Sequence, residues 1–571
     1  MTADSEEKSA PSRRAWPIFR SLRGATPAGL GRDVVAGLTL AAIAIPVQMA
    51  TARLGGFAPQ TGFIAFVAAC LGVAAFGANR RLAAGADSTI TPIFAGSLAL
   101  LAVAGAPQYP VLAAAFAIMV GVMLVAAGAF KLGWIADLLS TPVISGFLAG
   151  IALHILLSQA PDILGLPEGS GSVYHRLRAI GAETGAINWV SAALGLGVLA
   201  VTFVAAKISA RIPGALIALV GATLVTVLFH LDRHGVAVLG PMRGGFPYPS
   251  LPLVGFQTAL RLAGLAFVVA LVVMVQTAAT TRSVSDGDSA PDVNGDFIGV
   301  GVGGLLAGLF GAFPVDASPP MTTIVSESGG RSGYAGLTAA LAVLLLAAFG
   351  APLLAHVPDA ALGGVLLFVA LKIVHFETFA AVLRRAPTEF GLALLTTALI
   401  VIFPIQTGVA LGMFLSLAHG VFTITRTRPI PFERAPGTTV WWPVSAGGHG
   451  ETEPGILVMG FQAPLSFLNA QDFKRGMLAA IGRRRGAARL LILEASSMVA
   501  IDFTASTVLE EVIAKARNAG MDFAVARLES VRARVAFDTF GLTDLLGANH
   551  LFRSVEEAIR TLKPQTSDQR K

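Results

Sequence analysis

The stretch Gly311-Ala-Phe-Pro-Val-Asp-Ala-Ser-Pro-Pro-Met-Thr-Thr-Ile-Val-Ser-Glu-Ser-Gly-Gly330 lies between two long apolar runs, yet it carries two acids, three prolines and several hydroxyl side chains. Asp316 and Ser318 precede Pro319 and Pro320, and proline suits the first turn of a helix. A short helix that begins inside a membrane needs polar groups to satisfy its free backbone N–H donors. The stretch therefore predicts an interrupted membrane helix that begins near mid-depth.

A second polar interruption, Gly85-Ala-Asp-Ser-Thr-Ile-Thr-Pro92, occurs in the first half of the chain. Asp87 and Ser88 are residue types that favour helix N-caps. Two such half-helices could point their N-termini at one central cavity, where the dipoles and the free N–H groups would bind an anion. The alternative is that these residues only pack, kink or cap their helices. A pair of interruptions, one in each half, favours the transporter interpretation.

The two acids of these interruptions, Asp87 and Asp316, would repel an anion unless they are protonated, hold a cation or face away from it. Proton-coupled anion symport is the simplest arrangement that accommodates both acids, and it makes each a candidate for binding the coupling ion. For each acid the alternative is a role as a helix cap alone.

The composition places the chain in a membrane. It has 571 residues, of which 54% are hydrophobic and 13% are charged, and its mean hydropathy is +0.72. Apolar runs of about 18 or more residues, long enough to span a hydrocarbon core about 30 Å thick, recur through most of the chain. They predict a polytopic α-helical protein with about 14 transmembrane segments in a 7+7 inverted repeat. The segments are expected to start near Val34, Thr61, Ser88, Pro110, Thr141, Ala186, Pro213, Thr258, Phe297, Ser318, Gly333, Pro358, Pro387 and Ile405.

The formal charge of +7 does not indicate a nucleic-acid partner, because the basic residues gather at alternate segment ends. This pattern predicts a multi-pass protein of the cell (inner) membrane with both termini in the cytoplasm. No cleavable signal peptide is expected in the N-terminal segment 1–32. The single cysteine, Cys70, excludes an internal disulfide and a multi-cysteine metal cluster, and we expect no cofactor and no metal.

The chain changes character after the transmembrane domain, which is expected over residues 33–427. Residues 428–454 are rich in proline and glycine and are predicted to be a linker. Residues 455–563 alternate between strand-like and amphipathic helix-like runs, which indicates a small α/β domain. The strands are expected at 457–461, 490–493 and 523–527, and the helices at 472–481, 507–518 and 555–562. The polar tail 564–571 is expected to be disordered.

Several other polar residues fall within the predicted spans. Gln48 and Gln276 lie on the first segment of each half, where an amide can line a cavity. His154 and His419 are assigned no role, because a lone histidine in a span is usually a hydrogen-bonded helix contact. Two further glutamines are left unassigned, Gln159 and Gln406.

Together these features resemble the SulP/SLC26 family of anion transporters, in which a fourteen-segment membrane domain is joined to a cytoplasmic STAS domain. The resemblance covers nearly the whole chain and rests on the order of several motifs: Asp33-Val-Val-Ala-Gly-Leu-Thr39, Ile45-Pro46, Met49-Ala50, Gly85-Ala-Asp-Ser88, Asn294-Gly-Asp-Phe-Ile298, Gly308-Leu-Phe-Gly-Ala-Phe-Pro314 and Gly329-Gly-Arg-Ser332. It implies a core that moves against a gate in an elevator-like cycle, with the substrate between half-helices 3 and 10. The substrate-binding residues that it implies are Gln48, Asp87, Ser88, Thr89, Gln276, Asp316, Ala317 and Ser318.

Three positions depart from the family pattern. Gln48 follows Val47, whereas relatives usually have glutamine directly after the proline, and one position rotates a side chain by about 100° around a helix. Gln276 stands where an acid is common, and Asp316 stands where many relatives have a small or hydroxyl residue. Because these positions are implied to bind the substrate and the coupling ion, neither is determined by the resemblance. The anion is expected to be sulfate, bicarbonate, a dicarboxylate or chloride, carried by symport or exchange. Sodium is the alternative to a coupling proton.

Residues 455–562 resemble a STAS domain through Ala463-Pro-Leu-Ser-Phe-Leu-Asn-Ala470, Leu490-Leu-Ile-Leu-Glu494 and Ile501-Asp-Phe-Thr-Ala505. In anti-sigma-factor antagonists the corresponding loop is phosphorylated, and Thr504 occupies the phosphorylated place. The alternative is that Asp502 and Thr504 only cap the following helix. The resemblance also implies a homodimer in contact with membrane lipid and a cytoplasmic partner for the STAS domain.

Two other functions remain open. A nucleobase permease shares this membrane fold, and Asp316 could hydrogen-bond a uracil-like ring. A membrane-anchored signalling protein would use the STAS domain to bind partners, although one or two spans would be enough for an anchor. An enzyme is not expected, because the sequence has no nucleophile triad, phosphate loop or metal cluster. Gly299-Val-Gly-Val-Gly-Gly304 has no flanking strand and is interpreted as a helix-packing surface.

Overall fold

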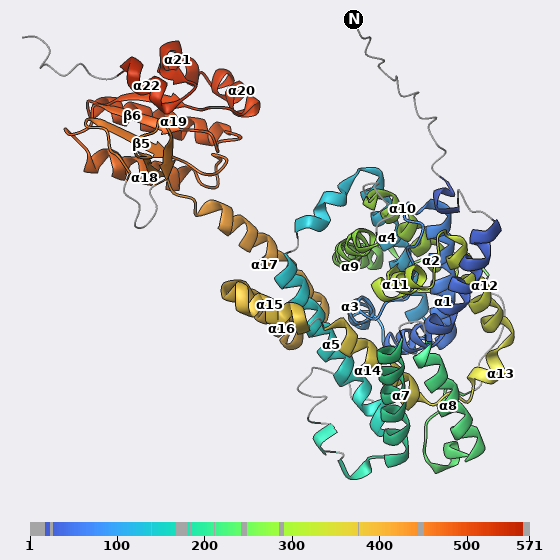
Figure 1. Ribbon diagram of the computed structural model, residues 1–571. Helices are drawn as coiled ribbons and strands as arrows, with labels where there is room; N and C mark the ends of the chain where they lie inside the picture. The colour runs from blue at the N-terminus through green and yellow to red at the C-terminus, as the bar shows by residue number, and fades with distance from the viewer. Residues whose placement is uncertain are drawn as a thin grey trace, which may run out of the picture. The chain divides into compact units, whose positions relative to one another are not determined.

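The computed structural model describes residues 18–22, 27–138, 140–166, 178, 180–182, 184–209, 212–240, 248–284, 291–374, 376–443 and 450–562. The chain divides into two compact units, Met1–Ser416 and Leu417–Lys571, which are described separately. Figure 1 shows both as ribbons. Most of the N-terminal segment 1–32 and all of the tail 564–571 lie outside the described residues.

The first unit consists mainly of helices, which are joined by turns and by two very short strands. Its elements are α1 (Pro27–Leu54), α2 (Pro59–Phe76), β1 (Ala84–Gly85), α3 (Thr91–Ala99), α4 (Tyr109–Ala129), α5 (Thr141–Leu164), α7 (Trp189–Ile208), α8 (Gly214–Leu228), α9 (Phe256–Ser283), α10 (Val293–Leu309), β2 (Asp316–Ala317), α11 (Pro319–Glu327), α12 (Tyr334–Phe349), α13 (Ala351–Leu354), α14 (Asp359–Ile373), α15 (Phe376–Arg385) and α16 (Pro387–Ile402). The helix α17 (Ile405–Thr425) begins in this unit and ends in the second.

Each of the predicted transmembrane segments contains a helix, and the predicted starts lie close to the observed ones. The largest difference is at α1, which begins at Pro27 rather than Val34. Within the described residues, 7 helices are long and apolar enough to cross a membrane. Shorter apolar helices of 10–17 residues and the 9-residue helices α3 and α11 complete a set that is consistent with the predicted segments.

The sequence pattern did not predict α15. Its described residues are all at least partly exposed, with Phe376 and Leu383 among the exposed apolar side chains. It ends in Arg384 and Arg385. A ten-residue amphipathic helix is too short and too polar to be recognised in a search for apolar spans.

The two halves of the first unit repeat the same order of elements. Each begins with a 28-residue helix, α1 or α9, which is followed by α2 or α10. A 2-residue strand and a 9-residue helix come next, β1 and α3 in the first half and β2 and α11 in the second. This repeated order agrees with the predicted inverted repeat.

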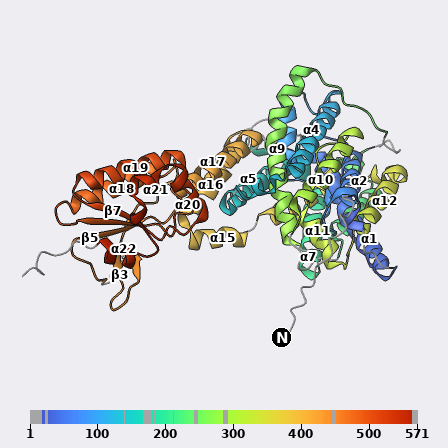
Figure 2. The same ribbon diagram turned by 90° about the horizontal axis from the view of Figure 1, so that it is seen from above.

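The helices of the first unit form two groups. In one group α10 packs against α2 and α4, and α1 packs against α2 and α12. In the other group α5 packs against α14 and α16, and α7 packs against α14 and α8. In Figures 1 and 2 the first group is gathered around α10, while α5 and α16 lie to one side. The two groups correspond to the expected core and gate.

Glycines allow α10 to approach its neighbours at backbone distance. A Cβ atom on Gly72 of α2 would lie 2.2 Å from the Gly303 nitrogen. A Cβ atom on Gly121 of α4 would lie 2.7 Å from the Gly301 oxygen. A larger residue at either place would force the helices apart. The interpretation of 299–304 as a helix-packing surface is confirmed.

The second unit contains a 6-stranded sheet in the order β4-β3-β5-β6-β7-β8. Its strands are β3 (Ile430–Arg434), β4 (Trp441–Pro443), β5 (Ile456–Gly460), β6 (Leu490–Glu494), β7 (Asp522–Ala526) and β8 (Leu551–Phe552). Strands β5 to β8 are parallel, whereas β3 is antiparallel to both β4 and β5. The predicted α/β domain is therefore present.

Helices cover both faces of this sheet. They are α18 (Ala470–Arg483), α19 (Phe503–Asn518), α20 (Val531–Thr539), α21 (Leu542–Leu546) and α22 (Val555–Leu562). Leu491 and Leu493 of β6 belong to the core beneath α18 and α19, whereas Leu490 and Ile492 belong to the core beneath α22. This alternation follows from the two-residue period of a strand.

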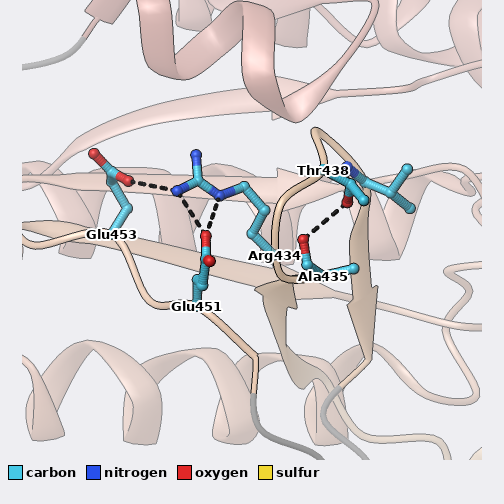
Figure 3. A network of polar contacts seen from close by, with 6 residues as sticks. Arg434, Ala435, Thr438, Glu451 and Glu453 are labelled. Carbon is cyan, nitrogen blue, oxygen red and sulfur yellow. Dashed lines mark hydrogen bonds and ion pairs between the residues drawn. The ribbon is translucent and has the colours of Figure 1, made fainter.

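The predicted linker 428–454 is not simply a linker, because it contains β3 and β4. Figure 3 shows how the end of β3 is held: the Arg434 guanidinium lies 3.0 Å from Glu451 Oε2 and 3.7 Å from Glu453 Oε2. The backbones of Arg434 and Glu451 also exchange two hydrogen bonds. The sequence pattern does not predict these strands, because proline and glycine favour irregular structure.

Candidate functional site

The two polar interruptions pair directly with each other. Strands β1 and β2 are antiparallel, with Ala84 opposite Ala317 and Gly85 opposite Asp316. The Ser318 N–H extends the pairing and donates to the Ala83 oxygen at 2.9 Å. The segments that lead into α3 and α11 are therefore paired within the first unit.

The start of α11 lies where the sequence predicts it. Ser318 is at the N-cap position, and Pro319 and Pro320 are the first two helical residues. The Ser318 side chain makes no capping hydrogen bond. Thr322 in the first turn instead accepts a hydrogen bond from the Ala83 N–H at 3.1 Å. Thr322 thus joins the second half to the first, and it was not among the predicted site residues.

The start of α3 differs from the prediction that Asp87 or Ser88 is its N-cap. The N-cap residue is Ile90, and α3 begins at Thr91. The Asp87 carboxylate accepts a hydrogen bond from the Thr89 N–H at 2.7 Å and also contacts the Thr89 hydroxyl. The Asp87 side chain therefore holds a turn just before the helix, as short acids commonly do.

Thr89 also links this turn to α9. Its hydroxyl lies 2.8 Å from Gln276 Oε1. The structure thereby brings together three of the predicted site residues, Asp87, Thr89 and Gln276. A hydroxyl has one hydrogen, so it cannot donate to the carboxylate and to the amide oxygen at the same time.

The side-chain amide of Gln48 bonds to the backbone of the first interruption. Its side chain is fully buried, and its Nε2 donates to the Ala86 oxygen at 3.1 Å. Its Oε1 accepts from the Ala86 N–H at 2.8 Å. Both polar atoms are therefore engaged with the backbone just after β1. Gln48 positions the interruption, and the rotation caused by its place after Val47 does not remove it from the site.

Asp316 is fully buried within β2. Its Oδ1 accepts hydrogen bonds from the Ala317 N–H at 2.7 Å and from the Thr277 hydroxyl at 3.3 Å. Among the described residues, Oδ2 has no hydrogen-bond partner. Thr277 was not predicted, although its place next to Gln276 on α9 could have suggested it.

The remaining predicted site residues and the unassigned polar residues fall into three sets. The hydroxyls of Ser88 and Ser318 are almost buried near the meeting point of the interruptions, and Ala317 pairs with Ala84. Gln159 lies on α5 and donates to its neighbour Ser158. His154 and His419 lie on α5 and α17, away from both interruptions in the sequence, and the side chain of Gln406 lies outside the described residues.

Thr504 lies in the second unit, exposed in the first turn of α19. The N-cap is Asp502, whose carboxylate accepts a hydrogen bond from the Ala505 N–H at 2.8 Å. The capping role that the sequence offered for Asp502 is thus present. Within the described part of the chain, no cluster of three or more side chains suited to a metal ion occurs.

Two protein-family models match this chain, and several relatives and solved structures are similar to it. Residues 30–396 match the model of the sulfate permease family, and residues 450–558 match the model of the STAS domain. A probable sulfate transporter of Mycobacterium tuberculosis is 31% identical over 93% of this chain and 95% of its own length. A putative sulfate transporter of Bacillus subtilis is 28% identical over 92% of this chain and 96% of its own length.

Two solved structures share the fold. A murine anion transporter, solute carrier 26 family member A9 in an inward-facing state, has a TM-score of 0.87 at 20% identity and covers 98% of this chain and 96% of its own. The transmembrane domain of a cyanobacterial bicarbonate transporter, BicA, has a TM-score of 0.60 at 23% identity, with 69% of this chain and 98% of its own covered. These likenesses concern the architecture of the chain.

Proposed function

Because this chain belongs to the sulfate permease (SulP/SLC26) family, whose members are transporters rather than enzymes, we propose that it is a secondary active transporter of a small anion. The observation that carries the proposal is the pairing of β1 with β2, the strands that lead into α3 and α11. The positive ends of two helix dipoles favour an anion at that place. Sulfate, bicarbonate and dicarboxylates are the substrate classes to test first, since the names of the relatives mention sulfate and bicarbonate.

The proposed binding site consists of the residues around the two interruptions. Ser88, Thr89, Gln276 and Ser318 supply polar groups, while Gln48 and Ala317 hold the backbone in place. Asp87 and Asp316 are the candidate positions for the coupling ion. The coupling ion is a proton rather than sodium, because protonation removes a negative charge beside the anion, whereas a sodium ion needs several oxygen ligands.

Alternating access follows from the two groups of helices. The group that contains α1, α3, α9 and α11 carries the site, and the group that contains α5, α7, α14 and α16 forms the gate. In an elevator-like cycle the first group moves as one body against the second. The close backbone contacts of α10 with α2 and α4 favour rigid movement of the first group.

The proposed setting is the cell membrane with both termini in the cytoplasm. This orientation rests on the basic residues at alternate segment ends. The STAS domain is then cytoplasmic, where it can bind a partner, contribute to a homodimer and expose Thr504 to phosphorylation. A deletion that tests this domain should begin before Ile430, because β3 and β4 belong to its sheet.

Uptake by proteoliposomes tests the proposal. Purified protein is reconstituted, and uptake of labelled sulfate, bicarbonate, fumarate, chloride and uracil is measured with and without an inward proton gradient. We expect saturable uptake of one of the anions, increased by the gradient, and no uptake of uracil. Uptake of uracil alone would indicate a nucleobase permease, and uptake of none of the five solutes would contradict a carrier of small anions.

A further inference from the structure

One buried oxygen at the site has no hydrogen-bond partner among the described residues. It is Oδ2 of Asp316, and the whole residue is 0% exposed. An ionised carboxylate oxygen in this state is strongly unfavourable, because burial removes its water and no donor replaces it. The same oxygen in its protonated form can donate one hydrogen bond, provided that a ligand supplies the acceptor.

The other oxygen of Asp316 is already engaged. Oδ1 accepts from the Ala317 N–H at 2.7 Å and from the Thr277 hydroxyl at 3.3 Å. A carboxylic acid carries its hydrogen on one oxygen only. Since two donors already point at Oδ1, the proton belongs on Oδ2.

The charges around Asp316 favour the neutral form. The elements packed against β2 include β1 and α9. The turn after β1 contributes a second acid, Asp87, and α9 contributes neutral Thr277 at the site and exposed Arg261 and Arg282 towards its ends. No hydrogen bond or ion pair from Arg or Lys to Asp87 or Asp316 occurs among the described residues. Two ionised acids and an anion would repel one another without compensation.

The start of α11 needs an additional donor if it is to hold an anion. Pro319 and Pro320 occupy the first two helical positions and have no N–H, so they remove two of the backbone donors that a helix start normally offers. The side-chain donors just before α11 are the Ser318 hydroxyl and a protonated Asp316. A protonated Asp316 would therefore add a second side-chain donor at the start of α11.

We propose that Asp316 carries the coupled proton on Oδ2 and donates a hydrogen bond from this O–H group to the bound anion, which the site accepts as an oxyanion. The proposal rests on the proposed function, because it requires an anion between α3 and α11. Asp316 takes up one proton from the side on which the anion enters and releases it with the anion, so one O–H bond forms and breaks in each cycle. Asp87 is a positioning residue, since its carboxylate holds the turn at Thr89.

Proton uptake on anion binding tests the proposal. Wild-type protein is held in weakly buffered detergent solution, and sulfate is added. Fumarate is added instead if proteoliposomes take it up faster than sulfate. A pH dye records the protons that the protein binds. The measurement is repeated over a range of pH, and we expect uptake to approach one proton per anion at pH values at which Asp316 of the anion-free protein is ionised. The D316N variant keeps an amide donor at the same place, so it should bind the anion within about tenfold of wild type but take up no proton. The matched control, D87N, should still take up the proton.

The outcomes separate this inference from the proposed function. Anion binding by the wild-type protein without proton uptake at any pH of the range would overturn the inference alone, as would normal proton uptake by D316N. Failure of the wild-type protein to bind or transport any anion of the panel would overturn the proposed function as well.

A second variant covers the case in which D316N does not fold. Thr277→Val removes one of the two donors to Oδ1, and it should shift the pH at which proton uptake is half-maximal by at least about half a unit. Thr280→Val, on the same helix, removes only a hydroxyl that donates to the Gln276 carbonyl at 2.7 Å, so it should leave that pH unchanged. Equal half-maximal pH values in the two variants would contradict the role of Asp316.

Discussion

The two halves of the membrane unit hold their acids in different ways. In the first half, Asp87 is tied to the turn that precedes α3, and Thr89 connects that turn to Gln276. In the second half, Asp316 lies within the paired strand itself, and one of its oxygens has no partner among the described residues. Each acid accepts a backbone hydrogen bond through Oδ1, Asp87 from Thr89 and Asp316 from Ala317, but of the two only Asp316 has a fully buried oxygen without a partner among the described residues. We therefore expect Asp87 to act on its own turn and Asp316 to act on the substrate.

The largest expected effect comes from breaking the strand pair that joins the halves. A Cβ atom on Gly85 would lie 2.9 Å from the Phe66 ring and 3.0 Å from Gln48 Nε2. We expect Gly85→Val to abolish anion uptake and to leave little folded protein in size-exclusion chromatography. The control is Gly264→Ala on α9, where a Cβ would meet nothing within 4 Å. Full uptake by Gly85→Val would show that the pairing of β1 and β2 is not required.

A comparison of the two glutamines should separate positioning from binding. Gln48→Leu leaves both polar groups of buried Ala86 without partners, so it should lower the free energy of unfolding by about 3 kcal/mol. Gln276 is partly exposed and its side chain bonds to the Thr89 hydroxyl rather than to backbone, so Gln276→Leu should reduce uptake more than stability. Thermal unfolding in detergent and initial uptake rates measure the two quantities. Equal losses of stability in both variants would contradict the distinction.

A smaller effect is expected at the contact between α11 and the first half. Thr322→Val removes the acceptor of the Ala83 N–H, and we expect a loss of about 1–2 kcal/mol in the free energy of unfolding. The adjacent residue provides the control, because the exposed Thr323 hydroxyl donates only to the carbonyl of Pro319 in its own helix. Thr323→Val should therefore unfold within about 0.5 kcal/mol of wild type. Thermal unfolding in detergent compares the two variants, and a larger loss in Thr323→Val would contradict the assignment.

The smallest effects are expected for the two serines. Ser88 and Ser318 have no side-chain hydrogen bond among the described residues, so replacement by alanine should change stability little. If each hydroxyl donates to the anion, Ser88→Ala and Ser318→Ala should each raise KM for uptake by about threefold to tenfold, which corresponds to the loss of one hydrogen bond. A change in KM for Ser318→Ala only would assign the substrate to the second half.

The transmembrane segments could be predicted because each contains a run of apolar residues, and the two interruptions could be predicted because they break such runs. The strands β3 and β4 could not, since their proline and glycine residues favour irregular structure until the neighbouring strand β5 is present. The helix α15 has only ten residues, which is too short for a membrane span to be recognised.

The site itself could be predicted only in part. The identity of Asp87, Asp316 and Gln48 was visible in the sequence, but the direction of each side chain depends on backbone from another part of the chain. Gln48 bonds to Ala86, which lies 38 positions away, and Asp316 bonds to Thr277, which lies 39 positions away. Helix periodicity gives no information about an interrupted backbone, so these partners required the folded structure.

The length of α3 and α11 has an electrical consequence. Nine residues of helix rise only about 13 Å, less than half of a hydrocarbon core about 30 Å thick. A solute held where these helices start has therefore crossed roughly half of the membrane voltage. If the solute and its proton carry a net unit charge, a potential of 100 mV would change their free energy of binding by about 1 kcal/mol. If together they are neutral, the potential would not change that free energy.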